Sequence, residues 1–198
     1  MVAAVAALVL ALSSAAAAPV ELVALAPKKL AHCRKAALLR AACPRLVPRV
    51  RAEYLNHLAV EREGTRFSLA TFNLERGAEY PDAPERNRPP RMAHLVVVGG
   101  HVERSAAGVF DDLRHVGLRD GLMRRTRDRS LGFGTMRWSG HAGELFLAPS
   151  YPRGGMLGNH LVFRWRTGRR DYVVSLHAWE PLTEAAATLR SVVASADR

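Results

Sequence analysis

Two histidines close the most regularly patterned stretch of this sequence, HLVFRWRTGRRDYVVSLH, which runs from His160 to His177. Apolar and polar residues alternate on both sides of a turn at Gly168, which is typical of a β-hairpin. The two apolar sets share a face only in the register that places Trp165 opposite Tyr172 and His160 opposite His177. The sequence therefore predicts two neighbouring imidazoles on the outer, polar face of a sheet, at its rim.

Such a pair could do chemistry in two ways. Directly opposed Cβ atoms lie ~4.5–5.5 Å apart, so both rings could bind one metal ion. Zinc would need a further protein ligand, and the candidates are His141, Glu144 and Glu180. Alternatively, one neutral imidazole could act as a general acid or base, oriented by Ser175 or Glu180. A polar pair without chemistry is the third interpretation. We expect no cofactor, because the sequence contains no HExxH, CxxC or GxSxG motif.

Arginines form the second group of candidate binding residues. Arg86, Arg88 and Arg91 belong to a proline-rich stretch, ERGAEYPDAPERNRPPR, that we expect to form a long loop over residues 75–91. Arg164 lies in the first strand of the hairpin described above. Guanidinium groups bind carboxylates and phosphates through paired hydrogen bonds, so these four residues could hold an anionic group. A solvated loop without a ligand is the plainer alternative.

The charge of the whole chain also favours an acidic partner. Of 29 basic residues only three are lysine, and the formal net charge is +11. The partner could be an anionic component of the cell envelope or another envelope protein bound through the basic segment 119–130. Nucleic acid is not favoured, because no aromatic residues interleave with that segment. A GC-rich genome would also produce a chain this rich in Arg and Ala.

The first residues indicate the cellular compartment in which the protein is found. MVAAVAALVLALSSAAAAP has an apolar stretch over residues 2–12 followed by small residues, so we expect residues 1–18 to be a signal peptide. A basic residue before the apolar stretch is missing. The alternative is an uncleaved segment, which would be the sole attachment to the membrane. Both interpretations place the protein outside the cytoplasm, secreted or in the cell envelope.

Cys33 and Cys43 are the two cysteines, and an even count in an exported chain suggests a disulfide. Residues 19–48 predict a partly helical arm or linker that Pro44 and Pro48 bring to an end. In one continuous helix, ten residues would separate the cysteines by ~15 Å. A disulfide needs Cα atoms ~4.4–6.8 Å apart. The bridge therefore requires a break in the helix.

Other elements follow from the periodicity of the rest of the chain. LAVEREGTRFSL predicts a hairpin that turns at Glu63 and Gly64 and sets Val60 opposite Phe67. The change of phase after Leu69 predicts a bulge near residues 70–71. Further strands are expected at MAHLVVVGG, GTMRW and GELFLA, with a helix over about residues 107–116. The chain ends in a helix that presents one apolar stripe, formed by Leu182, Ala186, Leu189 and Val193.

Together these elements predict an α+β fold in a single domain over residues 49–198. We expect a mainly antiparallel sheet of about six strands, with the C-terminal helix packed on one face, a helical N-terminal arm, and the other face open. The function predicted is that of a small exported binding or structural domain whose ligand contacts the open face or the 75–91 loop. The alternative is a His-based or metal-dependent hydrolase that uses His160 and His177.

Overall fold

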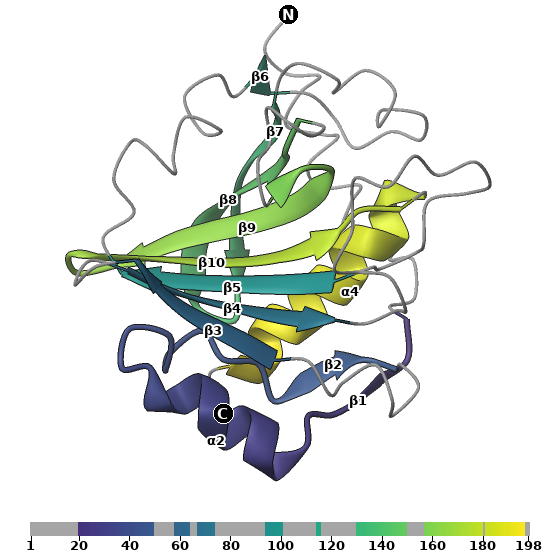
Figure 1. The fold of residues 1–198 in the computed structure, drawn as a ribbon. Coiled ribbons are helices and arrows are strands. Elements are labelled where there is room, and N and C mark those ends of the chain that lie inside the picture. Colours follow the sequence, from purple (N-terminus) through teal and green to yellow (C-terminus); the bar gives the residue numbers. More distant parts are fainter. Residues whose placement is uncertain are drawn as a thin grey trace, which may run out of the picture.

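The computed structural model describes residues 20–49, 58–63, 67–73, 94–100, 114–115, 130–149, 157–179 and 181–196, with backbone alone for 58–63, 67, 69, 73, 94, 114 and 115. The fold is mostly antiparallel sheet with a C-terminal helix (Figure 1). No helix within these ranges is long and apolar enough to cross a membrane.

Eight strands of the described residues form one sheet, in the order β3-β4-β5-β10-β9-β8-β7-β6. Every neighbouring pair is antiparallel except β6 and β7, which run parallel. The strands are β3 (Leu58–Glu63), β4 (Phe67–Asn73), β5 (His94–Gly100), β6 (Arg114–His115), β7 (Leu131–Trp138), β8 (His141–Leu147), β9 (His160–Thr167) and β10 (Arg170–His177).

The strand count and one helix differ from the prediction. The sheet has eight strands instead of about six. The helix expected over 107–116 is wrong near its end, because Arg114 pairs with Leu131 in the parallel ladder of β6 and β7. Residues 101–113 and 116 lie outside the described residues. A two-residue strand has too few positions to show a period, so the sequence pattern could not reveal β6.

The hairpin of β9 and β10 has the predicted register. Trp165 lies opposite Tyr172, and His160 lies opposite His177. The turn passes through Gly168 with φ of +60°, a conformation that glycine adopts without steric cost. The predicted register is confirmed, and it brings both apolar sets of the hairpin into the same core.

The hairpin of β3 and β4 corrects the prediction. Val60 pairs with Ala70, not Phe67, and the paired strands end at Glu63 and Phe67. The bulge expected near residues 70–71 is also wrong, because β4 pairs with β5 without interruption. Ala70 and Phe72 are the residues that enter the core, at 0% and 2% exposure. Their phase, and not that of Phe67 and Leu69, sets the register.

The C-terminal helix α4 (Leu182–Ala196) packs on the sheet face that carries the aromatic residues. Its predicted apolar stripe is buried, with Leu182 and Leu189 at 0% exposure. Figure 1 shows α4, in yellow, crossing the sheet. The main hydrophobic core combines this helix with Phe163, Trp165 and residues of the N-terminal segment.

The opposite face of the sheet is also covered where the strands are apolar. A second buried cluster there contains Val96, Val98, Ala148, Phe146, Leu157, Val162 and Val173. The expectation of an open face is therefore wrong for this region. The cause is β5, a continuous apolar strand that presents valines to both faces, as strands buried on both sides do.

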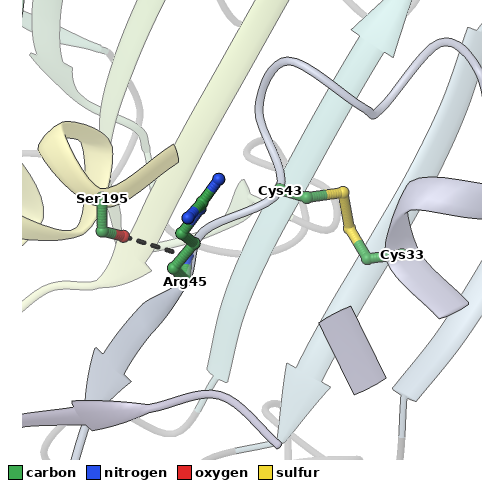
Figure 2. The surroundings of a disulfide bond; sticks show 4 residues. All are labelled: Cys33, Cys43, Arg45 and Ser195. Carbon is green, nitrogen blue, oxygen red and sulfur yellow. Dashed lines mark hydrogen bonds between the residues drawn. A yellow bond between two sulfur atoms is a disulfide. The ribbon is translucent and has the colours of Figure 1, made fainter. Parts of the chain in front are cut away.

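The N-terminal segment contributes a small sheet, a helix and a disulfide. Strands β1 (Leu22–Ala24) and β2 (Leu46–Pro48) pair antiparallel, and helix α2 (Pro27–Lys35) lies between them in sequence. The helix ends before Cys43, so the chain turns back and the cysteines are bonded with Cα atoms 6.1 Å apart. Figure 2 shows the bond between the two cysteines. Both cysteines are fully buried.

Two contacts attach this segment to the rest of the fold. The Ser195 hydroxyl of α4 accepts hydrogen bonds from the backbone N–H groups of Arg45 (3.1 Å, Figure 2) and Leu46 (3.0 Å). At Gly99 in β5, a Cβ atom would overlap the carbonyl oxygen of Leu38. The loop between the cysteines therefore rests directly on the sheet backbone, which only glycine permits at this position.

Candidate functional site

Polar residues gather on the second face of the sheet, at the end near the Gly168 turn. Four adjacent strands contribute them, and strand pairing places Glu144 opposite both Thr135 and Arg164, and Arg166 opposite Asp171. These residues surround a hollow with a volume of about 330 Å³. We call this the polar hollow; it is lined by Thr135, Ala142, Gly143, Glu144, Arg164, Trp165, Arg166 and Asp171.

A buried carboxylate holds two guanidinium groups in the polar hollow. Arg166 donates from Nε and Nη2 to the two oxygens of Asp171, both at 3.0 Å, and Arg164 donates from Nη2 at 3.2 Å. The Asp171 side chain is 6% exposed, that of Arg164 20% and that of Arg166 64%. The carboxylate is thus the floor of the site, and Arg166 remains accessible to a ligand.

The ion pairs of Asp171 with Arg166 and Arg164 determine the protonation of this carboxyl group. Burial alone would raise the pKa of Asp171, but its hydrogen bonds and charge interactions with Arg166 and Arg164 outweigh burial and lower it below the usual value. The pKa of Arg166 is raised, first by its hydrogen bond to Asp171 and then by the charge of that carboxylate. Asp171 is therefore ionised at neutral pH and keeps both guanidinium groups in place.

Glu144 adds a second carboxylate to the polar hollow. It stands directly opposite Arg164 on the neighbouring strand and is exposed. Opposed residues on one face are close enough for charge interaction. The four charges of the hollow therefore cancel formally, with two guanidinium groups and two carboxylates.

The second candidate site is the pair His160 and His177. Their ring centroids are 5.6 Å apart and the ring planes are nearly perpendicular, at 88°. His160 Nδ1 lies 2.9 Å from the Ser175 hydroxyl oxygen, and that hydroxyl donates to the Val96 carbonyl at 3.4 Å. The Ser175 hydroxyl therefore links the His160 ring to the backbone of β5.

The histidine pair differs from the polar hollow because both of its rings are buried. His160 is 0% exposed and His177 7%, so the expectation that both rings lie outside the interior of the protein is wrong. The second apolar cluster, on the same face, is the physical reason. Burial lowers the pKa of His177 from 6.5 to about 4, so its ring is neutral at physiological pH.

His141, expected as a third ligand, does not join this pair. His141 lies on the opposite face, where its ring stacks on Trp165 with centroids 4.9 Å apart. Glu180, Arg86, Arg88 and Arg91 lie outside the described residues. Within the described part of the chain, no group of three or more His, Cys, Asp or Glu is arranged to hold a metal ion.

Sequence reasoning named Arg164 but missed most of the polar hollow. The register that sets Trp165 opposite Tyr172 also sets Arg166 opposite Asp171, yet nothing in the sequence shows that the carboxylate is buried. Glu144 was considered only as a metal ligand. The available signal was the charge pattern on the polar face of the hairpin, where Arg164, Arg166 and Asp171 lie together near the turn.

Comparisons with known proteins identify no relative: no protein-family model matches the sequence, and no curated protein or solved structure matches it significantly. The function therefore has to be argued from the geometry of the polar hollow and of the histidine pair.

Proposed function

We propose that this chain is an exported binding domain of the cell envelope that holds an acidic ligand in the polar hollow. The observation that carries the proposal is the pair of guanidinium groups that buried Asp171 holds beside an open cavity. A guanidinium held in place loses little conformational freedom when a ligand binds, so binding is stronger than to a freely moving arginine. Carboxylate and phosphate oxygens match its donor geometry.

Two features support export. The apolar segment over residues 1–18 has the composition of a signal peptide. The disulfide between Cys33 and Cys43 is buried in the core, and such bridges persist in oxidising compartments outside the cytoplasm.

The net positive charge of the whole chain also supports an acidic ligand, which it would attract from a distance. The formal net charge is +11, although the four charges of the polar hollow cancel. The overall field would attract an acidic ligand, and the local geometry would select where it binds. We therefore expect binding that weakens with salt and depends on Arg166 beyond its contribution to the net charge.

The alternative function, a hydrolase based on His160 and His177, has less geometric support. A general acid or base must come within hydrogen-bonding distance of its substrate. His160 is fully buried, and its Nδ1 is engaged with Ser175. The polar hollow, in contrast, is open and carries exposed charged groups.

Calorimetric titration of the disulfide-bonded chain with poly-L-glutamate tests the proposal. Arg166→Gln keeps a donor for Asp171 but removes the accessible charge, so the affinity should fall by about tenfold, or ~1.4 kcal/mol. Arg170→Gln is the matched control, because Arg170 is exposed in the same hairpin, outside the hollow lining, and its loss changes the net charge equally. The control should change the affinity by less than about threefold.

Glu144→Gln gives a test of opposite sign. Removing this exposed carboxylate from the polar hollow should strengthen binding of poly-L-glutamate by about two- to fivefold, the size of a surface charge interaction. Equal losses in Arg166→Gln and Arg170→Gln, or no effect of Glu144→Gln, would show that the polymer follows net charge alone. The polar hollow would then not be the binding site.

A further inference from the structure

The outer face of helix α2 carries exposed basic side chains. Lys28, His32 and Lys35 are exposed and follow one another at the spacing of one helix face. Leu30 packs against the main core and Cys33 is fully buried in the disulfide, so these two residues mark the opposite face. Figure 1 shows α2, in dark purple, at the outside of the fold. The disulfide therefore fixes which face of α2 the protein presents to its surroundings.

The segment that contains this helix is strongly basic. Residues 20–49 include a single acidic residue, Glu21, which forms an ion pair with Arg49 at 2.6 Å. Their basic residues are Lys28, Lys29, Arg34, Lys35, Arg40, Arg45 and Arg49. All three lysines of the chain lie in α2. A GC-rich genome favours arginine throughout a chain, so it does not account for this concentration of lysine in one helix.

We propose that the outer face of α2 is a docking surface for a membrane that contains anionic lipid. Lysine is a compact charge on a flexible stem, which suits contact with many mobile headgroups. Arginine is better suited to paired hydrogen bonds with one fixed carboxylate or phosphate. A cluster of basic residues on a helix is a pattern typical of binding to an anionic lipid surface. An anionic membrane is therefore the partner whose charge and mobility match this face.

The composition of the face favours docking by charge, without insertion. Ala31 lies on the same face and is exposed, so a small side chain separates Lys28 from Lys35. Helices that enter the membrane interface do so with a large apolar face. The apolar face of α2 is turned into the protein through Leu30 and Cys33. Long lysine stems still carry the ammonium groups out to the headgroups. We therefore expect docking that salt reverses.

The position of α2 in the sequence also supports a membrane as the partner. Residues 19–26 alone separate the apolar segment 1–18 from Pro27, the first residue of α2. Even fully extended, they span at most about 28 Å. Whenever segment 1–18 is inside a membrane, α2 is therefore held near the membrane surface. This step rests on the proposed export, whereas the charge of α2 does not. The sequence predicted segment 1–18 as the sole attachment; the face of α2 adds a second one that persists after cleavage.

Co-sedimentation of the disulfide-bonded chain with lipid vesicles tests the docking surface. One set of vesicles is phosphatidylcholine, and the other is a mixture of phosphatidylcholine and phosphatidylglycerol. The measured quantity is the ratio of the two partition coefficients, because residues 1–18 can contribute with both sets. One lysine near an anionic surface strengthens binding by about fivefold. Lys28→Gln/Lys35→Gln should therefore lower the ratio by about 25-fold, and salt at about 1 M should bring the ratio of the unaltered chain close to one.

Arg169→Gln/Arg170→Gln is the matched control. Both arginines are exposed where the hairpin of β9 and β10 turns, and their loss changes the net charge equally. Charges away from the docking surface are screened, so the ratio should fall by less than about threefold. Lys28→Arg/Lys35→Arg keeps the charge and should retain the ratio. Every substituted side chain is exposed, and cooperative thermal unfolding of each variant checks that it folds.

The proposal is overturned if phosphatidylglycerol does not raise the partition of the unaltered chain, or if Lys28→Gln/Lys35→Gln lowers the ratio no more than the control. Titration with poly-L-glutamate separates this surface from the polar hollow. The lysine variant should change the affinity for the polymer no more than the control does. If it weakens polymer binding as strongly as vesicle binding, α2 is a general site for polyanions and the membrane proposal is wrong. The docking surface and the polar hollow therefore fail independently.

Discussion

Trp165 and Tyr172 lie directly opposite each other on the same face of the sheet, with ring centroids 5.5 Å apart and planes inclined by 24°. Both rings enter the core beneath α4. Their pairing fixes the register of the hairpin, so every polar residue at an alternate position of β9 and β10 must lie on the other face. The polar hollow and the histidine pair both exist because of this one relationship.

Asp171→Asn should destabilise the protein at neutral pH by about 1–3 kcal/mol, because the Arg166 and Arg164 donors lose their charged acceptor. The folded-state pKa of Asp171 is lowered, so its stabilisation is present above its unfolded pKa of ~3.9 and is lost as the pH falls through the folded value. Urea unfolding at pH 7 and pH 2.5 measures this. The difference between the two proteins should shrink at the lower pH; an equal difference at both would contradict the ion-pair account.

His177 should make the protein sensitive to mild acid. Burial lowers its folded-state pKa to about 4, so between that value and ~6.5 the unfolded chain binds a proton that the folded chain does not. Stability should fall by about 1.4 kcal/mol per pH unit on going from pH 6.5 to pH 4, and should be flat above pH 7. His177→Gln should reduce that slope by about one proton. Unfolding in urea over this pH range measures both slopes, and an unaltered slope in the variant would refute the assignment.

The disulfide should contribute substantially to stability. Replacing Cys33 and Cys43 by serine opens a loop of ten residues, and the chain-entropy model assigns such a loop about 3 kcal/mol. Two buried hydroxyl groups would add to the loss. Denaturant unfolding of the double variant measures it. A loss below about 1 kcal/mol would mean that the contacts of the loop, such as those at Ser195, hold the segment without the bridge.

Gly99→Ala should disturb the fold more than Gly168→Ala. A methyl group at Gly99 would overlap the Leu38 carbonyl oxygen, so the loop between the cysteines would have to move, at a cost of at least about 2 kcal/mol. At Gly168 nothing lies within 4 Å of the added atom, and the cost is the positive φ alone, about 1 kcal/mol. Thermal unfolding of both variants compares them. The reverse order would show that the loop does not rest on β5.

An element of this fold could be predicted where several local sequence features indicate the same strand register. The hairpin of β9 and β10 was predictable in full, because two apolar sets and one glycine turn allow a single register. The hairpin of β3 and β4 was not, because two phases compete in β4: Phe67 and Leu69 form one apolar set, and Ala70 and Phe72 the other. Packing against β5 and the core decides between them, and that is a tertiary property that no local pattern contains.

The candidate site shows the same limit. Register placed Arg166 opposite Asp171 and His160 opposite His177, so the pairs could be predicted. Their burial could not, since it depends on the second apolar cluster, whose members come from β5, β8, β9, β10 and the turn at Leu157.

The central claim is that an acidic ligand binds in the polar hollow. Mapping of amide chemical-shift changes while poly-L-glutamate is added tests it most directly, because every residue except proline carries an amide that reports. We expect the largest changes at Thr135, Glu144, Arg164 and Arg166, saturating together and weakening with salt. Changes that centre on the basic segment 119–130, or that spread over all exposed arginines without saturating, would contradict it.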